Sequence, residues 1–537
     1  MSGKPSLMTF SIGPVHTFIA QARRVADLWA GSTILSHLVS TAIRVLLERG
    51  GEMVFPCISE KGRIPTGLPN RFVCRIPSTE AGDVAKAMKK SVEVEWTRLS
   101  VEAARILAEI GVLGTSTVPD PFQEQVSQAI EVAWSWVEQD EGNYAGASRK
   151  GAAQFAGARM FRPYTQDSEI GVKCAVCGER TALPDGVGKN VRAAWEKAEA
   201  ASKGNKRERY FRKDQTRLCL VCATKRLYPV TGGSGRDAYF SAFDRFEPQE
   251  DGPNGREARQ PYFAVVSMDG DNMGRVLGWD ASRVHNVEGF HRRVSEILTA
   301  FAERLRTAGS PELNLATLKY TPKGDKPPQL VYAGGEDILF ICGPRDALPL
   351  AKAIREEYRR SFDGDSDLRD LVKDAVNIRK FTISAGILFA HTKHPAGLVF
   401  RDVQDLLSRK AKDEEGRDAV AIRLDKRGGV PVEVAFKWDG DAGGRAWPEA
   451  LEGIVDCLVE GTLSSGRTFD LREEERILSA IFQTPEQWNS WLTEKLSRGE
   501  GNGAMVERLA GLMGPFFIGG KIEALRIARF LGREVGQ

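Results

Sequence analysis

Two adjacent acids, Glu336 and Asp337, follow the pair Gly334-Gly335 and stand between two apolar runs of the sequence. An apolar run that breaks at Gly-Gly and then resumes is typical of a β-hairpin whose turn takes positive φ angles. We therefore expect Glu336 and Asp337 at the tip of a hairpin. The two glycines would also let the backbone approach a phosphate group without a Cβ clash.

A second acidic stretch follows the apolar strand expected at Phe263–Val266, where Asp269 and Asp271 flank Gly270. If this strand and the hairpin are neighbours in one sheet, their acidic ends converge, and converging carboxylates repel one another unless a cation lies among them. Hard oxygen ligands favour Mg²⁺ or Mn²⁺, which bring substrate phosphates with them. The sequence thus predicts a Mg²⁺ or Mn²⁺ site held by the two acids of each stretch, with the Gly270 carbonyl as a further ligand. Either stretch alone would be an ordinary surface turn.

Carboxylates at a strand end and at a hairpin tip are suited to nucleotidyl transfer. In that reaction two metal ions activate the attacking hydroxyl and neutralise the charge on the leaving pyrophosphate. Asp269, Glu336 and Asp337 are the predicted catalytic residues, and Asp269 is the best candidate to bridge both ions. Lys412, at the end of a helix expected from Phe400, could reach a triphosphate or be a solvated lysine.

Four of the eight cysteines form two Cys-x-x-Cys pairs, Cys174/Cys177 and Cys219/Cys222. Four thiolates at this spacing suit a tetrahedral site with no open coordination position, so we predict a structural Zn²⁺. The other four cysteines are expected to pack as small apolar residues. Between the pairs lies the basic run 203–213 with two aromatic residues, which could contact nucleic-acid phosphates and bases or be a solvated loop.

The length of 537 residues predicts three or four domains. Lys and Arg exceed Asp and Glu by only 75 − 72 = 3, so a nucleic-acid surface would have to be a local patch. No run of eighteen apolar residues occurs and the N-terminus lacks a secretory pattern, so we expect a cytoplasmic protein without a membrane segment.

From residue 261 the predicted elements run β-α-β-β-α-β with a helix appended, the order of a ferredoxin-like palm. The first 110 residues have a similar pattern without acids at a strand end, and we also predict helices at 16–29 and 119–139 and a loop at 142–161. Helical periodicity after residue 447 predicts a bundle. His16, His391 and His394 are interpreted as polar or turn residues rather than catalysts.

The predicted fold is therefore α+β and multidomain. It comprises an N-terminal palm-like domain (1–165), a zinc-binding insert (166–235), a catalytic palm (236–440) and a C-terminal helical domain (441–537).

The sequence resembles a known family, the large palm-domain subunit of type III CRISPR effector complexes in its Cmr (type III-B) form. The resemblance lies in residues 10–24, 27–32, 268–274, 334–337 and 522–531 and in the two cysteine pairs. It implies two palms that face each other, with a zinc-bearing domain between them and a helical domain at the C-terminus. It also implies synthesis of cyclic oligoadenylates from ATP, switched on when target RNA pairs with the crRNA held by the other subunits.

The resemblance matches Asp269, Glu336 and Asp337 to the metal ligands of the family and assigns residues 11–18 to the first palm's side of the nucleotide site. The predicted nucleotide contacts are Ser11, Gly13, Phe18, Gly334, Gly335, Ser384 and Lys412.

The sequence departs from the family at two points. The hairpin reads Gly-Gly-Glu-Asp where the family usually has Gly-Gly-Asp-Asp, although the longer Glu336 carboxylate can still reach a metal. Many relatives begin with a histidine–aspartate nuclease domain, whereas this chain has no His-Asp dipeptide, so we do not expect DNA cleavage. Two other functions remain open: a scaffold that anchors guide RNA and partner subunits, and a free-standing dinucleotide cyclase.

Overall fold

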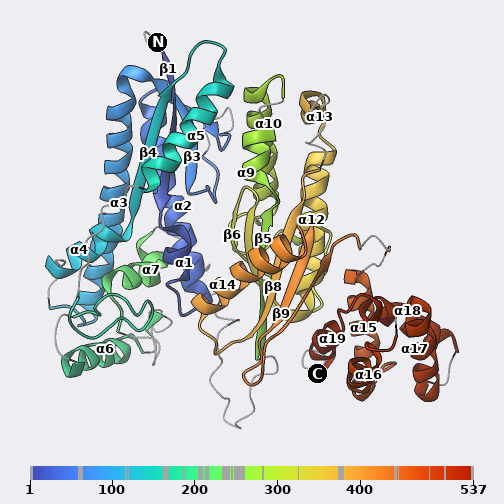
Figure 1. The fold of residues 1–537 in the computed structure, drawn as a ribbon. Helices are drawn as coiled ribbons and strands as arrows, with labels where there is room; N and C mark the ends of the chain where they lie inside the picture. The colour runs from blue at the N-terminus through green and yellow to red at the C-terminus, as the bar shows by residue number, and fades with distance from the viewer. Residues whose placement is uncertain are drawn as a thin grey trace.

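A computed structural model describes most of the chain (Figure 1). The described residues are 4–533 apart from 59–63, 115–117, 119, 161–168, 185–187, 204–209, 212–216, 233–241, 244–245, 247–260, 281–283, 325, 373–379, 441–443, 445–446, 483 and 501–502. Most of the basic run 203–213 lies outside the described residues.

The N-terminal part contains a four-stranded antiparallel sheet in the order β2-β3-β1-β4. The central strand β1 is buried along most of its length, because helices α2 and α3 cover one face of the sheet. The elements are β1 (Pro5–Gly13), α1 (Val15–Ala20), α2 (Val25–Glu48), β2 (Glu52–Phe55), β3 (Arg71–Pro77), η1 (Ser78–Glu80), α3 (Ala81–Glu109), α4 (Asp120–Ala129), β4 (Glu131–Glu138) and α5 (Tyr144–Met160).

Three predictions for this part were wrong. The helix expected at 16–29 is broken at 21–24, between α1 and α2. The helix expected at 119–139 ends at Ala129 and is followed by strand β4, which pairs with β1 and in which Ser135 and Val137 are buried while their neighbours are more open. This alternation is the pattern of a strand with one buried face. Residues expected as a loop at 142–161 form helix α5, whose small residues lie against β4.

A six-stranded sheet in the order β10-β9-β8-β5-β7-β6 forms the centre of the molecule. The predicted β-α-β-β-α-β order is confirmed, and β10 is an additional strand that we did not predict. The elements are β5 (Tyr262–Gly270), α9 (Met273–Arg275), η4 (Val276–Asp280), α10 (Val287–Arg304), α11 (Leu315–Leu318), β6 (Gln329–Gly334), β7 (Asp337–Cys342), η6 (Pro344–Asp346), α12 (Ala347–Asp363), α13 (Ser366–Val372), β8 (Ile383–His391), α14 (Ala396–Asp405), η7 (Leu406–Glu414), β9 (Ala419–Leu424) and β10 (Val432–Lys437).

The central strand β5 is apolar without alternation because both of its faces are buried. Val265 belongs to the core shared with α14 and the N-terminal part, whereas Val266 belongs to the core under α10 and α12. Its neighbours in the sheet are β7 and β8, both antiparallel to it. The four strands β8-β5-β7-β6 have the same relative order as the four strands of the N-terminal sheet.

The described residues after 446 form five helices, which lie beside the central sheet (Figure 1). Their buried apolar residues belong to the same core as those of α10 and α12. The helices are α15 (Trp447–Val459), α16 (Ser465–Leu478), α17 (Pro485–Glu500), α18 (Gly503–Ile518) and α19 (Ala524–Arg533). The sequence predicted a helix in each of these places.

The cysteine-containing segment, with α6 (Gly188–Ser202) and α7 (Leu220–Thr231), packs against the N-terminal part. Helix α7 carries a buried arginine, Arg226, that binds both carboxylate oxygens of the buried Asp27 in α2, at 2.5 and 2.7 Å. A buried charge pair with two hydrogen bonds is costly to break, because the remaining charge would lie unpaired in the core.

Helix α2 is the one described helix that is long and apolar enough to cross a membrane. More than half of its apolar stretch is buried inside the fold, where it packs against α3 and α7. Its composition is that of a helix at the centre of a core.

Candidate active site and metal-ligating residues

Strand pairing brings the two acidic stretches together. Met268 at the end of β5 is paired with Ile338 in β7, so that Asp269 and Asp337 are next to each other across the sheet. Gly334 pairs with Asp337, and Gly335 has φ +70°, as the predicted hairpin turn requires. The two acids of the hairpin thus differ in position: Glu336 lies in the turn, and Asp337 begins β7.

Gly270 lies so close to the hairpin that a side chain cannot fit there. A Cβ at this position would lie 2.9 Å from the Cβ of Glu336 and 3.0 Å from the Tyr358 hydroxyl oxygen. The carbonyl oxygen of Gly270 points to the same place as the acids, since it accepts a hydrogen bond from the Lys412 ammonium at 3.2 Å.

The charges at this point affect one another. Enclosure by the protein raises the pKa of Glu336 to about 6, the charge of Asp269 adds to this rise, and Lys412 and Arg71 oppose it. The pKa of Asp337 is also raised well above its usual range. The main cause is that protein surrounds the carboxyl group, and the charges of Asp269 and Glu336 add to the rise. Asp337 nevertheless remains open to solvent, because it lines a cavity.

The Lys412 ammonium lies between the Asp269 carboxylate and the Gly270 carbonyl. It lies between two oxygen atoms of the kind that a hard divalent ion prefers as ligands. The residues that could hold such an ion are Asp269, Glu336, Asp337 and the carbonyl of Gly270.

Asp271, predicted as a metal ligand, is buried, and both of its carboxylate oxygens are hydrogen-bonded within the sheet. One of its carboxylate oxygens accepts a hydrogen bond from the Ser384 hydroxyl at 2.8 Å. The other accepts from the Thr382 hydroxyl at 2.8 Å and from the backbone N–H of Asp418 at 2.9 Å. These bonds direct its carboxylate into the sheet, where it ties β5 to β8 and β9.

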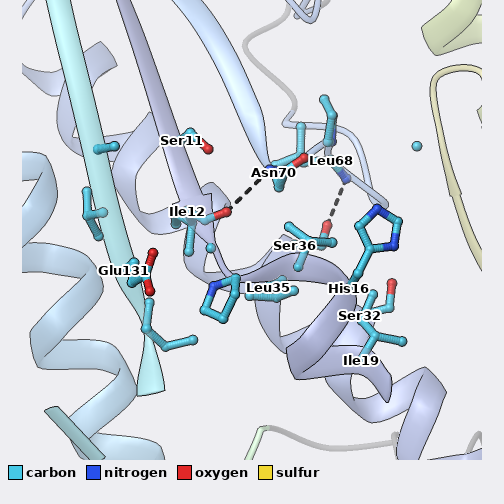
Figure 2. Close-up of a pocket in the computed structure, with 18 of the residues that line it drawn as sticks. Ser11, Ile12, His16, Ile19, Ser32, Leu35, Ser36, Leu68, Asn70 and Glu131 are labelled. Atoms are coloured by element: carbon cyan, nitrogen blue, oxygen red, sulfur yellow. Dashed lines mark hydrogen bonds between the residues drawn. The ribbon is translucent and has the colours of Figure 1, made fainter. Parts of the chain in front are cut away.

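A cavity of about 790 Å³ lies between the two sheets and reaches Asp337. The central sheet contributes Tyr332, Gly334 and Asp337, together with Phe400 of α14. Most other lining residues come from the N-terminal part, and Figure 2 shows several of them (Ser11, His16, Ser36, Asn70 and Glu131) around the space. Two hydrogen bonds in Figure 2 hold this wall: the Asn70 amide to the Ile12 carbonyl at 3.3 Å, and the Leu68 N–H to the Ser36 hydroxyl at 2.7 Å.

Of the predicted nucleotide contacts, Ser11, Gly13 and Gly334 line this cavity. Phe18 does not, because its ring is buried in the core beneath the Lys225 ammonium, which lies 4.9 Å from the ring centre. Ser384 is also buried and is bonded to Asp271. Gly335 lines a small neighbouring cleft of about 30 Å³.

Sequence reasoning missed the cations that the N-terminal part places near the acids. Arg159, at the end of α5, lines the cavity, and so does Lys89 of α3. Arg71, at the start of β3, is close enough to Glu336 to influence its pKa. If residues 144–160 had been predicted as a helix, Arg159 at its end would have been a candidate for the cavity wall. Nothing in the sequence indicates that Arg159, Lys89 or Arg71 lies opposite the hairpin.

The four paired cysteines converge as predicted. The Sγ atoms of Cys174, Cys177, Cys219 and Cys222 all lie within 4.8 Å of one another. Four sulfurs bound tetrahedrally at about 2.3 Å from zinc would be about 3.8 Å apart, and the Cys177 and Cys219 sulfurs are 3.9 Å apart. The backbone N–H groups of Val176 and Cys222 each point at a sulfur at 3.4 Å. The donor set therefore fits a tetrahedral metal ion.

Two family models match this chain. One is described as Cas10/Cmr2, second palm domain, and covers residues 262–421; the other is described as CRISPR-associated protein Cmr2, N-terminal, and covers residues 7–100. The first range contains Asp269, Glu336, Asp337 and Lys412, and the second contains the β1 side of the cavity.

A curated relative, the CRISPR system Cmr subunit Cmr2 of Pyrococcus furiosus, is 25% identical over 575 residues, which include 81% of this chain and 63% of the relative. This chain thus spans less than two thirds of that protein.

Two solved structures share the fold. One is described as the cryo-EM structure of the apo state of type III-B Cmr-beta, with a TM-score of 0.61, 13% identity and coverage of 93% of this chain and 77% of the other. The second, of the same type III-B Cmr-beta bound to cognate target RNA, has a TM-score of 0.57 and 12% identity, covering 94% of this chain and 79% of the other. Sequence and fold therefore agree: the chain is similar to the Cas10/Cmr2 family in residues 7–100 and 262–421, and it shares the fold of these two solved structures.

Proposed function

We propose that this chain is the catalytic large subunit of a crRNA-guided type III CRISPR effector complex of the cytoplasm. In this proposal it converts ATP into cyclic oligoadenylates by metal-dependent nucleotidyl transfer when target RNA is bound. The observation that supports the proposal most directly is that Asp269 lies beside Asp337 across the sheet, with Glu336 in the adjoining turn, and that Asp337 lines the cavity between the two sheets. We also propose that the two sheets are two palms that face each other, since their strands have the same order.

In the proposed reaction, a hydroxyl oxygen of one ATP ribose forms a bond to the α-phosphorus of another ATP. The bond from that phosphorus to the pyrophosphate breaks, and the hydroxyl proton is lost. Bound Mg²⁺ or Mn²⁺ would supply the charge that activates the hydroxyl and stabilises the pyrophosphate.

The residues of the chain have separate tasks in this reaction. Asp269, Glu336 and Asp337 would hold the cations, with the Gly270 carbonyl as a further ligand. Lys412 now neutralises Asp269; with a cation in place, its ammonium is free to bind a triphosphate. The raised pKa of Glu336, about 6, still leaves this side chain mostly ionised at neutral pH.

The N-terminal wall of the cavity would bind the second nucleotide. The volume of the cavity, about 790 Å³, lies within the usual range for ligand sites, about 300–1,000 Å³. Ser11 and Gly13 present polar and backbone groups there, and Arg159 and Lys89 add positive charge for phosphates.

We further propose that the four cysteines hold a structural Zn²⁺. A site with four protein sulfurs has no position for substrate, so the metal would contribute to folding and not to catalysis. The proposed partners are the other subunits of a type III-B complex, the crRNA and the target RNA. A solved relative of the same fold is described as bound to cognate target RNA.

The test uses the chain assembled with the other subunits, the guide and complementary target RNA, with labelled ATP and Mg²⁺ or Mn²⁺. We expect oligoadenylate products that disappear in the Asp337→Ala variant, while assembly and target-RNA binding are unchanged. Asp370→Ala, at an exposed acid of α13, is the matched control and should keep full activity.

Two outcomes would contradict the proposal. No product from the wild-type chain, and none from Glu336→Asp, would favour a scaffold that anchors guide RNA and partner subunits. Equal product with and without target RNA would favour a free-standing cyclase.

A further inference from the structure

A second cavity, of about 370 Å³, lies where the β9–β10 hairpin meets helices α16 and α19 of the C-terminal part. Figure 1 shows these helices beside the central sheet. Five cationic side chains line the cavity, and no acidic residue is among its described lining residues. The cations are Lys426, Arg472, Arg526, Arg529 and Arg533.

Two of these arginines make local ion pairs that are partly exposed to solvent. Arg472 contacts Glu473, the next residue of α16, at 2.5 Å, and Arg526 contacts Glu523, one turn earlier, at 2.9 Å. Exposed pairs of this kind contribute about 0–1 kcal/mol. An incoming anion can therefore replace them at little cost.

Arg529 has a different environment. Its Nε donates a hydrogen bond to the Ser465 hydroxyl at 2.7 Å, and among the described residues no carboxylate lies within ion-pair distance of its guanidinium. Its guanidinium lies 5.7 Å from the ring centre of Phe469, and that of Arg472 lies 5.4 Å from the same ring. The ring therefore holds two guanidinium groups at the cavity, while 45% of Phe469 remains exposed.

The exposed hairpin extends the cationic surface. All its residues from Lys426 to Pro431 are exposed, and they include Arg427 and the pair Gly428-Gly429, which lets backbone approach closely. Val430 at the tip is 82% exposed, so an apolar side chain is available beside the cationic ones.

This cavity is separate from the candidate active site. Strand β9 begins at Ala419, beside the bonds that hold Asp271, and ends at Leu424, which lines the cationic cavity. Six residues of strand span about 20 Å. A ligand in the cationic cavity therefore does not touch the acids of the active site.

We propose that this cavity binds single-stranded nucleic acid, with one nucleotide inside it and neighbouring phosphates along the hairpin. Guanidinium groups form paired hydrogen bonds with phosphate oxygens, and the exposed face of Phe469 offers a stacking surface for a base. A duplex is a poorer fit, because a concave site of this size cannot enter a groove as a helix or ribbon does. An acidic peptide would satisfy the arginines but would leave the ring and the apolar hairpin tip without a partner. The proposal does not depend on the nucleotidyl transferase activity.

The experiment measures binding of the full chain to fluorescein-labelled oligouridylate and oligodeoxythymidylate, each of twenty nucleotides, by fluorescence anisotropy at several salt concentrations. The first variant, Arg526→Ala/Arg533→Ala, removes two exposed cations and should not disturb folding. We expect its affinity to fall at least about 10-fold, and its slope of log K against log salt to become shallower by about 1.4, since each phosphate contact on a single strand contributes about 0.7. The two labelled probes distinguish RNA from DNA as the natural source of the strand.

Arg476→Ala/Arg508→Ala is the matched control, because both side chains are exposed on C-terminal helices and neither lines the cavity. It should keep the affinity and salt slope of the wild type. Phe469→Ala should weaken binding about 5- to 100-fold without changing the salt slope, as expected for loss of one stacked base. Thermal unfolding of each variant checks that the C-terminal part remains folded.

Three results would each overturn the proposal. The first is that the wild-type chain binds neither oligonucleotide. The second is that the cavity variant binds as tightly as the control variant. The third is that a decaglutamate peptide displaces the oligonucleotide at a concentration equal to or below that of an unlabelled decanucleotide, which would assign the cavity to an acidic peptide.

Discussion

Replacing Gly270 with alanine tests whether the two acidic stretches meet as closely as the structure places them. The added Cβ would lie 2.9 Å from the Cβ of Glu336 and from the Cγ of Met273, and 3.0 Å from the Tyr358 hydroxyl oxygen. Carbon atoms in contact prefer about 3.5–4.0 Å, so the hairpin must move away by about 0.6–1.1 Å. The neighbouring core limits other solutions, because Tyr358 is fully buried between Phe301 and Phe362.

This displacement should have a small effect on stability and a large effect on the site. Overpacking of this kind costs about 1–3 kcal/mol, whereas a displacement of about 1 Å at reacting groups can lower a rate about 100-fold. We expect the Gly270→Ala chain to fold, to bind Mn²⁺ at least about 10-fold more weakly than the wild type, and to lose about 100-fold of the oligoadenylate yield in the assembled complex.

Mn²⁺ binding to the chain is measured by electron paramagnetic resonance of the free ion, and product yield by chromatography of labelled nucleotides. Gly274→Ala is the control, because no atom lies within 4 Å of a Cβ at that position. Its Mn²⁺ affinity and product yield should match the wild type. If Gly270→Ala bound Mn²⁺ within twofold of the wild type, the acids near 270 and those near 336 would not share a cation, and the assignment of the site would fail.

Three further predictions concern the remainder of the fold. The purified chain should contain one zinc per molecule by atomic absorption, and Cys222→Ser should lower both this content and the temperature of unfolding; zinc at the wild-type level in the variant would contradict the tetrahedral site. Asp27→Asn removes the carboxylate that forms two hydrogen bonds with the buried Arg226 guanidinium and should lower the free energy of unfolding by about 3–5 kcal/mol in urea titrations, whereas Asp83→Asn, at an exposed pair 3.9 Å long, should change it by less than about 1 kcal/mol. Gly397→Ala places a Cβ 2.0 Å from the last carbonyl oxygen of α1 and should lower the free energy of unfolding by about 1–3 kcal/mol, so an unchanged unfolding midpoint would show that the contact between α1 and α14 is not rigid.

The acidic hairpin and the strand before Asp269 could be predicted from sequence because their signals are local. A glycine pair between apolar runs specifies a turn, and β5 is apolar on both faces because both are buried. The cysteine site was predictable for the same reason, since spacing within each pair fixes two ligands at once.

The sequence could not predict where a side chain points when residues distant in the chain determine its direction. Asp271 has the same residue type and nearly the same position as Asp269, but the hydroxyls of Thr382 and Ser384 direct it into the sheet. Phe18 lies in a segment that does reach the cavity, yet its ring turns toward the core and the Lys225 ammonium. Nothing local in the sequence distinguishes these residues from their neighbours.

The break in the helix expected at 16–29 also has a non-local cause, and it connects three parts of the molecule. The carbonyl of Gln21 accepts a hydrogen bond from the Lys225 ammonium of α7 at 2.6 Å. The carbonyls of Ala22 and Arg23 accept from the first two N–H groups of α14, at 2.9 and 3.1 Å. These carbonyls can do so only because they are not used within a helix.

Helix α14 continues directly into η7, which carries Lys412 to Asp269. The broken segment 21–24 is thus a shared contact between the cysteine-containing part, which supplies Lys225, and the helix that positions the lysine of the candidate active site. A metal bound by the cysteines would hold α7, and through Lys225 the segment on which α14 begins. This series of contacts connects the candidate metal site of the cysteines to the lysine of the candidate active site.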